Sequence, residues 1–82
     1  MVGGWTVAEE LTLAPMRRLI KRHGDLRISE EAGEELRRVV GDYGSRIAEA
    51  AVAHAREEDR RTVLAVDIRV AQRRVEGAVE GR

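Results

Sequence analysis

The sequence predicts an all-α protein of three helices, with a long helix between two short ones. Apolar residues recur with helical spacing along most of the chain, and strand-like alternation is nearly absent. The chain has no Phe and no Cys, and it has one Trp and one Tyr. The core must therefore be aliphatic, and disulfide scaffolds, cysteine-based zinc sites and thiol catalysis are excluded. At 82 residues, the chain is expected to form one domain.

The first predicted helix covers residues 13–23 and follows an N-terminal extension over residues 1–12. Pro15 suits the first turn of a helix, because an N–H in that turn would have no partner within the helix. Apolar side chains fall on one face of this helix, at Met16, Leu19 and Ile20. Gly24 ends the helix, and a short extended link leads to the next one.

The central helix is predicted from residue 30 to about residue 56. Ser29 is a good N-cap, and the two glutamates after it suit the positive end of the helix dipole. A helix of this length spans about 40 Å at ~1.5 Å per residue. A compact globule of roughly 80 residues is only about 30 Å across. Two short helices cannot cover the apolar stripe, so we expect an obligate dimer in which the central helices cross.

Two glycines lie at the middle of this helix, at Gly41 and Gly44, with Tyr43 between them. A glycine inside a helix costs about 0.5–1 kcal/mol relative to alanine. Small residues let two helix backbones approach closely, so we expect these three residues at the dimer crossing. The alternative is that the glycines are merely tolerated on a solvent-facing surface.

The third helix is predicted over residues 65–75, after a charged connection at residues 57–62. It can continue weakly beyond that point, because Gly77 and Gly81 lower the helix propensity. Residues 76–82 are therefore expected to form a C-terminal tail.

The charges cancel in total but not along the chain. Lys and Arg balance Asp and Glu, 15 against 15, so the net charge at neutral pH is zero. Residues 13–29 and 60–82 are nonetheless basic, whereas residues 30–59 are acidic. All but one of the Lys and Arg residues are arginine, the side chain best suited to paired contacts with phosphate. The distribution indicates two short basic segments that the net charge conceals.

Several short motifs, in this order and at this spacing, resemble those of the archaeal histones. They are Leu13-Ala14-Pro15-Met16, Arg27-Ile28-Ser29, Arg60-Arg61-Thr62-Val63, Asp67-Ile68 and Ala71. The resemblance implies a histone-fold domain over residues 13–75, paired with a second chain in an intertwined handshake dimer. A prokaryotic histone of bacterial origin would show much the same motifs.

The resemblance also implies a function and its residues. Archaeal histones bend and wrap duplex DNA where the first loop of one chain lies beside the second loop of the other. The matching DNA-binding positions here are Arg18, Lys21, Arg27, Arg61 and Thr62. Arg60 and Asp67 resemble the ion pair that fixes the second loop against the third helix.

One position departs from the family pattern. Glu57 stands where many archaeal histones have a histidine that pairs with the helix-3 aspartate of a neighbouring dimer, here Asp67. Two carboxylates that meet across such a contact repel each other, and burial adds to the cost of keeping both charged. We therefore expect dimers that do not stack, unless the side chains turn to solvent or His54 or Arg56 neutralises them.

The residues point to no enzyme, metal, cofactor or small-molecule substrate. The sequence has no nucleophile elbow, phosphate-binding glycine loop or pair of catalytic carboxylates. His54 and the acids at 57–59 fit a solvated helix end better than a metal site. No apolar run approaches the ~20 residues that span a bilayer, and no secretory leader is expected.

The expected partners are double-stranded DNA and a second chain, either an identical copy or a paralogous histone. This predicts a cytoplasmic protein at the nucleoid. The rival interpretation is a histone-fold module that pairs with protein partners and binds DNA weakly or not at all. The net charge of zero favours the rival, whereas the arginines of the two basic segments favour DNA binding.

Overall fold

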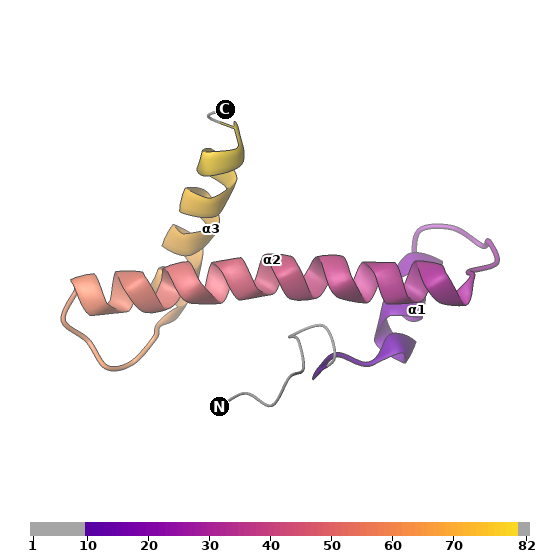
Figure 1. The fold of residues 1–82 in the computed structure, drawn as a ribbon, viewed down its shortest axis with the longest axis horizontal. Helices are drawn as coiled ribbons and strands as arrows, with labels where there is room; N and C mark the ends of the chain where they lie inside the picture. The colour runs from indigo at the N-terminus through magenta and orange to yellow at the C-terminus, as the bar shows by residue number, and fades with distance from the viewer. Residues whose placement is uncertain (1–9, 81–82) are drawn as a thin grey trace. The chain divides into compact units, whose positions relative to one another are not determined.

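The structure is a computed structural model that describes residues 10–80, with side chains as far as Gly77. It contains α1 (Leu13–Lys21), α2 (Glu30–Glu57) and α3 (Ala65–Glu80), and no strand occurs in this part of the chain (Figure 1). The all-α class and the short, long, short order of helices are confirmed. Residues 1–9 of the expected N-terminal extension and 81–82 of the expected tail lie outside the described residues.

Helix α1 ends two residues earlier than predicted. After Lys21 the chain tightens, because His23 donates its backbone N–H to the carbonyl oxygen of Ile20 at 3.0 Å. Pro15 is the third residue of the helix, where an N–H would have no partner within the helix. None of the residues of α1 is buried, so its own chain leaves the apolar face of this helix uncovered.

Helix α2 begins where the sequence predicts. The Ser29 hydroxyl accepts a hydrogen bond from the N–H of Ala32 at 3.1 Å, which confirms Ser29 as the N-cap. The helix then runs for 28 residues. It is shared by two compact units, the first ending at Tyr43 and the second beginning at Gly44. The single expected core is thus divided, since a helix about 42 Å long extends beyond any one core of this size.

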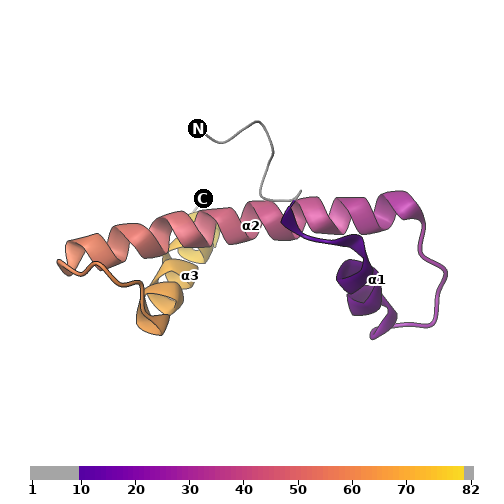
Figure 2. The same ribbon diagram turned by 90° about the horizontal axis from the view of Figure 1, so that it is seen from below.

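In the first unit, α1 packs against the beginning of α2 (Figure 2). A Cβ atom at Gly33 would lie 3.5 Å from Cγ of Arg17 and 3.8 Å from Cδ2 of Leu13. The Arg37 guanidinium donates a hydrogen bond to the carbonyl oxygen of Leu11 at 3.2 Å. Gly33 is therefore the glycine that lets these two helices approach.

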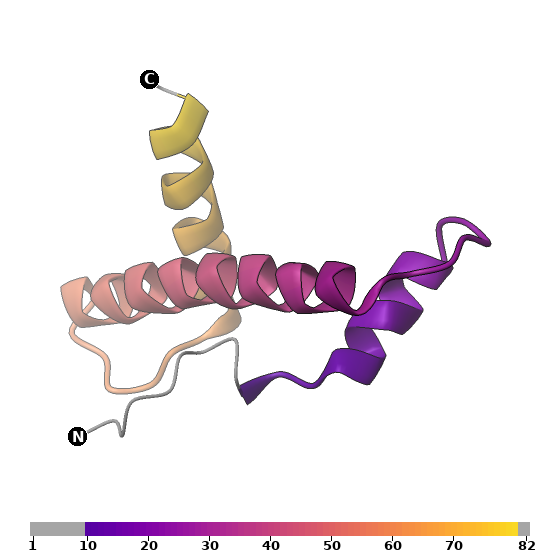
Figure 3. The ribbon, with the colours of Figure 1, turned by 45° about the vertical axis from the view of Figure 1, so that its right-hand side comes forward.

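In the second unit, α3 crosses the later half of α2 (Figures 1 and 3). The core at this crossing consists of Ile47, Ala51 and Ala71, with Ala50 and Val75 packed against it. Ala51 and Ala71 are 1% and 0% exposed, and their small side chains let the two helices lie close together. Helix α3 continues to Glu80, well past the predicted end at residue 75, so Gly77 weakens this helix without ending it.

The end of α2 is a Schellman turn with a residue of unusual conformation. Arg60 donates its N–H to the carbonyl oxygen of Ala55 at 2.9 Å, and Asp59 donates to that of Arg56 at 2.9 Å. Asp59 has φ of 61°, in the left-handed region where glycine is the usual residue.

Replacing Asp59 by glycine should therefore stabilise the protein. Glycine adopts this backbone without the contact between Cβ and the carbonyl oxygen, and we expect a gain of about 0.5–1 kcal/mol. Glu58→Gly is the matched control, because Glu58 has no positive φ and should only lose stability. Thermal midpoints at one fixed protein concentration make the comparison. A lower midpoint for Asp59→Gly would show that the aspartate side chain itself stabilises the turn.

Little apolar surface is buried in the described part of the chain. The buried hydrophobic residues are Ile47, Ala51, Ala55 and Ala71. Many larger apolar side chains are exposed: Leu19, Leu26, Val39, Val40, Tyr43, Val52, Val63, Leu64, Val66 and Ile68. Extensive apolar exposure of this kind marks an interaction surface. Within residues 10–80, no helix has the length and apolar composition needed to cross a membrane.

Candidate nucleic-acid interface

The loop between α2 and α3 is held by one buried carboxylate. Asp67 is 0% exposed and is the third residue of α3. Its Oδ2 and Oδ1 atoms each accept a hydrogen bond from the Arg60 guanidinium at 2.8 Å. Oδ2 also accepts the N–H of Leu64 at 2.6 Å, which caps the start of α3, and Oδ1 bonds to Nδ1 of His54 at 2.5 Å. Asp67 thus joins the end of α2, the loop and the start of α3, and the Arg60–Asp67 pair is the one that the resemblance implies.

These bonds change the ionisation of the buried carboxyl group. The hydrogen bonds from Arg60 hold the pKa of Asp67 well below its usual range, and those from the Leu64 N–H and His54 act in the same direction. Burial alone would raise this pKa, but its effect is smaller than that of the donors. Asp67 is therefore ionised throughout the neutral and mildly acidic range.

Acid should remove the stabilisation that Asp67 provides. Because its pKa is lower in the folded than in the unfolded chain, where it is about 3.9, the stabilisation is complete above about pH 5. It is lost progressively as the pH falls below the unfolded value toward the folded one. We expect Asp67→Asn to have a lower thermal midpoint at neutral pH and a flatter midpoint profile between about pH 5 and 2. Glu57→Gln, which alters an exposed carboxylate, is the control. An equally steep profile in Asp67→Asn would assign the acid sensitivity to other carboxylates.

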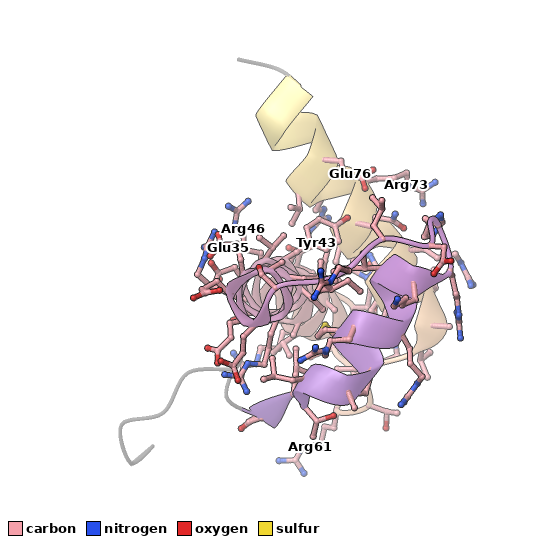
Figure 4. The ribbon with its side chains drawn as sticks, turned by 90° about the vertical axis from the view of Figure 1, so that its right-hand side faces the viewer. Glu35, Tyr43, Arg46, Arg61, Arg73 and Glu76 are labelled. Carbon is pink, nitrogen blue, oxygen red and sulfur yellow. The ribbon has the colours of Figure 1, made fainter. Side chains whose placement is uncertain are left out.

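The same clamp determines what the loop presents outward. The Arg60 guanidinium also donates to the carbonyl oxygen of Thr62 at 3.0 Å, so it fixes the loop backbone. Arg61 and Thr62 are both exposed. The Arg61 side chain points away from the ribbon, and no acidic side chain in the described part of the chain pairs with it (Figure 4). The loop therefore offers an unneutralised guanidinium beside a hydroxyl.

The first unit carries the other predicted contacts. Arg18 and Lys21 lie in the last turn of α1, and Arg27 lies in the connection between α1 and α2 (Figure 3). All three side chains are exposed. Lys21 lies 3.8 Å from Asp25, an exposed pair worth about 0–1 kcal/mol. Each unit thus presents its own predicted cations to solvent.

The acidic charge of α2 is largely paired within the chain. Arg38 binds Glu35 and Asp42, Arg37 lies 3.6 Å from Glu34, and Arg74 lies 3.1 Å from Glu57. The hydrogen bond from Arg38 lowers the pKa of Glu35, and that from Arg74 lowers the pKa of Glu57. Within residues 10–80, Arg18, Arg27 and Arg61 have no such partner, so the zero net charge conceals their availability.

The expectation that Glu57 opposes Asp67 at a dimer–dimer contact is wrong in its premise. Asp67 has no exposed side chain, because the turn after α2 places it between His54, Arg60 and the Leu64 N–H. Glu57 accepts hydrogen bonds from Arg74 at 3.1 and 3.2 Å. His54 is only 14% exposed and faces Asp67 rather than a neighbouring molecule. Both carboxylates are thus satisfied inside one chain, and no repulsion between them remains to limit stacking.

The crossing residues divide into two kinds. Gly41 is buried within its own chain, so its small size does not need a crossing partner. A Cβ atom at Gly44 would meet no atom within 4 Å, and Tyr43 beside it is 40% exposed. Gly44 is therefore the mid-helix glycine that remains open to a second helix.

In the described part of the chain, no cluster of three His, Asp or Glu side chains could hold a metal ion.

The matches to known proteins agree with this geometry. Residues 9–71 match the family model of the histone-like transcription factors (CBF/NF-Y) and archaeal histones. The archaeal histone HAN1 of Thermococcus zilligii is 39% identical over 62 residues, which cover 76% of this chain and 92% of that protein. The chain therefore belongs to the histone-fold family of archaeal histones and histone-like transcription factors. Helix α3 continues beyond residue 71, where the family match ends.

Proposed function

We propose that this protein is an architectural DNA-binding protein that pairs two chains and bends, wraps and compacts duplex DNA with little sequence specificity. The observation that carries the proposal is the distribution of charge. Most acids of α2 are paired with arginines of the same chain, whereas Arg27 and Arg61 are exposed without an acidic partner among residues 10–80.

The surface of the single chain supports pairing. Val39, Val40 and Tyr43 are 47%, 36% and 40% exposed along the middle of α2. Gly44 beside them leaves room for a second helix backbone. A second chain, identical or paralogous, would bury these side chains at about 25 cal/mol per Å² of apolar area. In this proposal Tyr43 and Gly44 lie at the crossing.

The chemistry of the exposed cations supports a duplex as the ligand. Arg18 and Lys21 suit phosphates of the DNA backbone, Arg27 suits the minor groove, and Arg61 with Thr62 suits phosphate. Contacts of these kinds carry little information about base sequence. A protein with this role would act in the cytoplasm, on the nucleoid, and would need no cofactor or catalytic group.

A gel-shift titration on duplex DNA over a range of salt concentrations tests the proposal. Affinity should fall linearly on a log–log plot, with a slope near −0.9 for each phosphate neutralised. Duplexes of unrelated sequence should give the same slope and similar affinities. Absence of any shift at about 50 mM salt, where backbone binding is strong, would contradict DNA binding.

The second candidate is a histone-fold interaction module with weak or no DNA binding. The net charge of zero favours it, because a neutral chain lacks long-range attraction to DNA. The same titration separates the two candidates. The module would give no salt-dependent shift while still forming dimers in sedimentation.

A further inference from the structure

A hollow lies beside the loop that the Asp67 clamp holds. Its volume is about 470 Å³, and it is lined by Val52, Ala55, Arg56, Arg60, Arg61 and Val63. Val52 and Val63 are 37% and 45% exposed, so the apolar floor is open to solvent. Arg60 is committed to Asp67, whereas Arg56 is exposed on the rim and has no acidic partner in the described part of the chain. The hollow therefore suits a segment with an apolar side chain next to a carboxylate.

The connection between α1 and α2 has this composition. Leu26 is 73% exposed, the highest exposure among the large apolar side chains of the described residues. Asp25 precedes it with a fully exposed side chain, and its contact with Lys21 at 3.8 Å is weak. An exposed leucine in a polar loop loses its contact with water when it enters an apolar hollow, which is favourable.

We propose that this loop of a second copy of the chain docks in the hollow, with Leu26 on the floor formed by Val52, Ala55 and Val63, and Asp25 against Arg56. The inference rests on the paired chains of the proposed function and specifies one of their contacts. In a two-fold dimer the contact occurs twice, because each chain offers both the loop and the hollow. Docking places Arg27 of one chain beside Arg61 of the other, so that two unneutralised guanidinium groups form one DNA-binding site.

Disulfide trapping tests the contact directly, because the natural chain has no cysteine. Chains carrying Leu26→Cys and chains carrying Val63→Cys, distinguished by a tag, are refolded together and mildly oxidised. We expect a covalent dimer containing one chain of each kind. Val39→Cys is the matched control for Val63→Cys, since Val39 is 47% and Val63 is 45% exposed. Trapping with Val39→Cys and not with Val63→Cys would overturn the inference.

Charge reversal supplies a second measurement. Asp25→Arg or Arg56→Asp alone should raise the dimer dissociation constant roughly threefold to tenfold, because each places like charges in contact. Both changes in one chain should return the constant to within about twofold of the natural value. Effects of the two changes that simply add would overturn the Asp25–Arg56 contact.

The outcomes also separate this inference from the proposed function. A protein that forms dimers and binds DNA, yet gives no disulfide between residues 26 and 63, retains its function and overturns the docking. Leu26→Ser should raise the dimer dissociation constant roughly tenfold or more. If it instead leaves this constant unchanged and lowers DNA affinity, the hollow or the loop binds the duplex, and docking by a second copy is wrong.

Discussion

The thermal unfolding midpoint of this protein should rise with its concentration, by roughly 3–6 °C for each tenfold increase. The reason is the small core of the single chain. Ile47 is the one larger aliphatic side chain among the buried hydrophobic residues of the described part, and the others are alanines. Folding must therefore be coupled to pairing. Calorimetry over two decades of concentration measures the effect, and a constant midpoint with a monomer in sedimentation would contradict it.

Substitution of Gly44 should locate the crossing. Leucine has nearly the helix propensity of alanine, so on a solvent-facing helix surface Gly44→Leu would gain up to about 1 kcal/mol. At a close crossing of two helices the same change should destabilise the dimer by about 1–3 kcal/mol, because the added side chain separates the backbones. Gly77→Leu is the matched control, since Gly77 also lies in a helix with no atom within 4 Å of its Cβ position. A gain in both variants would show that α2 does not cross its partner at Gly44.

Arg27→Ala combined with Arg61→Ala should weaken DNA binding by about a hundredfold or more, on every duplex sequence. A dimer loses four guanidinium groups in this variant, and each phosphate left uncontacted removes about 0.9 from the steepness of the salt dependence. Thermal stability should change little, because neither side chain has a partner among residues 10–80.

The control for this variant removes arginines that the chain already neutralises. Arg38 is paired with Glu35 and Asp42, and Arg74 is paired with Glu57. Arg38→Ala combined with Arg74→Ala should leave DNA affinity within about threefold, because those side chains are already neutralised and contribute little to phosphate binding. Equal losses in the two double variants would mean that affinity follows total charge, and that Arg27 and Arg61 have no special position.

Local signals predicted the order of the helices and the start of α2. Ser29 and the glutamates after it determine that start by short-range capping, which depends on residues within one turn. The ends were less predictable. Helix α1 stops before His23, and α3 passes Gly77, because a glycine changes helix stability by only about 1 kcal/mol.

The interactions of Asp67 and Glu57 show why the site was harder to predict. The spacing of Glu34 with Arg37 and of Glu35 with Arg38 could have been recognised as helical ion pairs. Glu57 and Arg74 are 17 residues apart, and His54 and Asp67 are 13 apart, so these contacts depend on how α2 and α3 pack. Without that packing, the sequence suggested two opposed carboxylates where the folded chain has two satisfied ones.

The internal pairing of acids has a consequence for the DNA that this protein coats. A chain of zero net charge binds through a few arginines, but it brings as many carboxylates as cations to the duplex. The coated fibre therefore keeps nearly the whole negative charge of the bare DNA, apart from small ions exchanged at the contacts. Neighbouring fibres would repel each other within a Debye length of about 10 Å at 0.1 M salt. Close condensation of such fibres would then depend on multivalent cations from solution, while the protein itself determines the path of the DNA within each fibre.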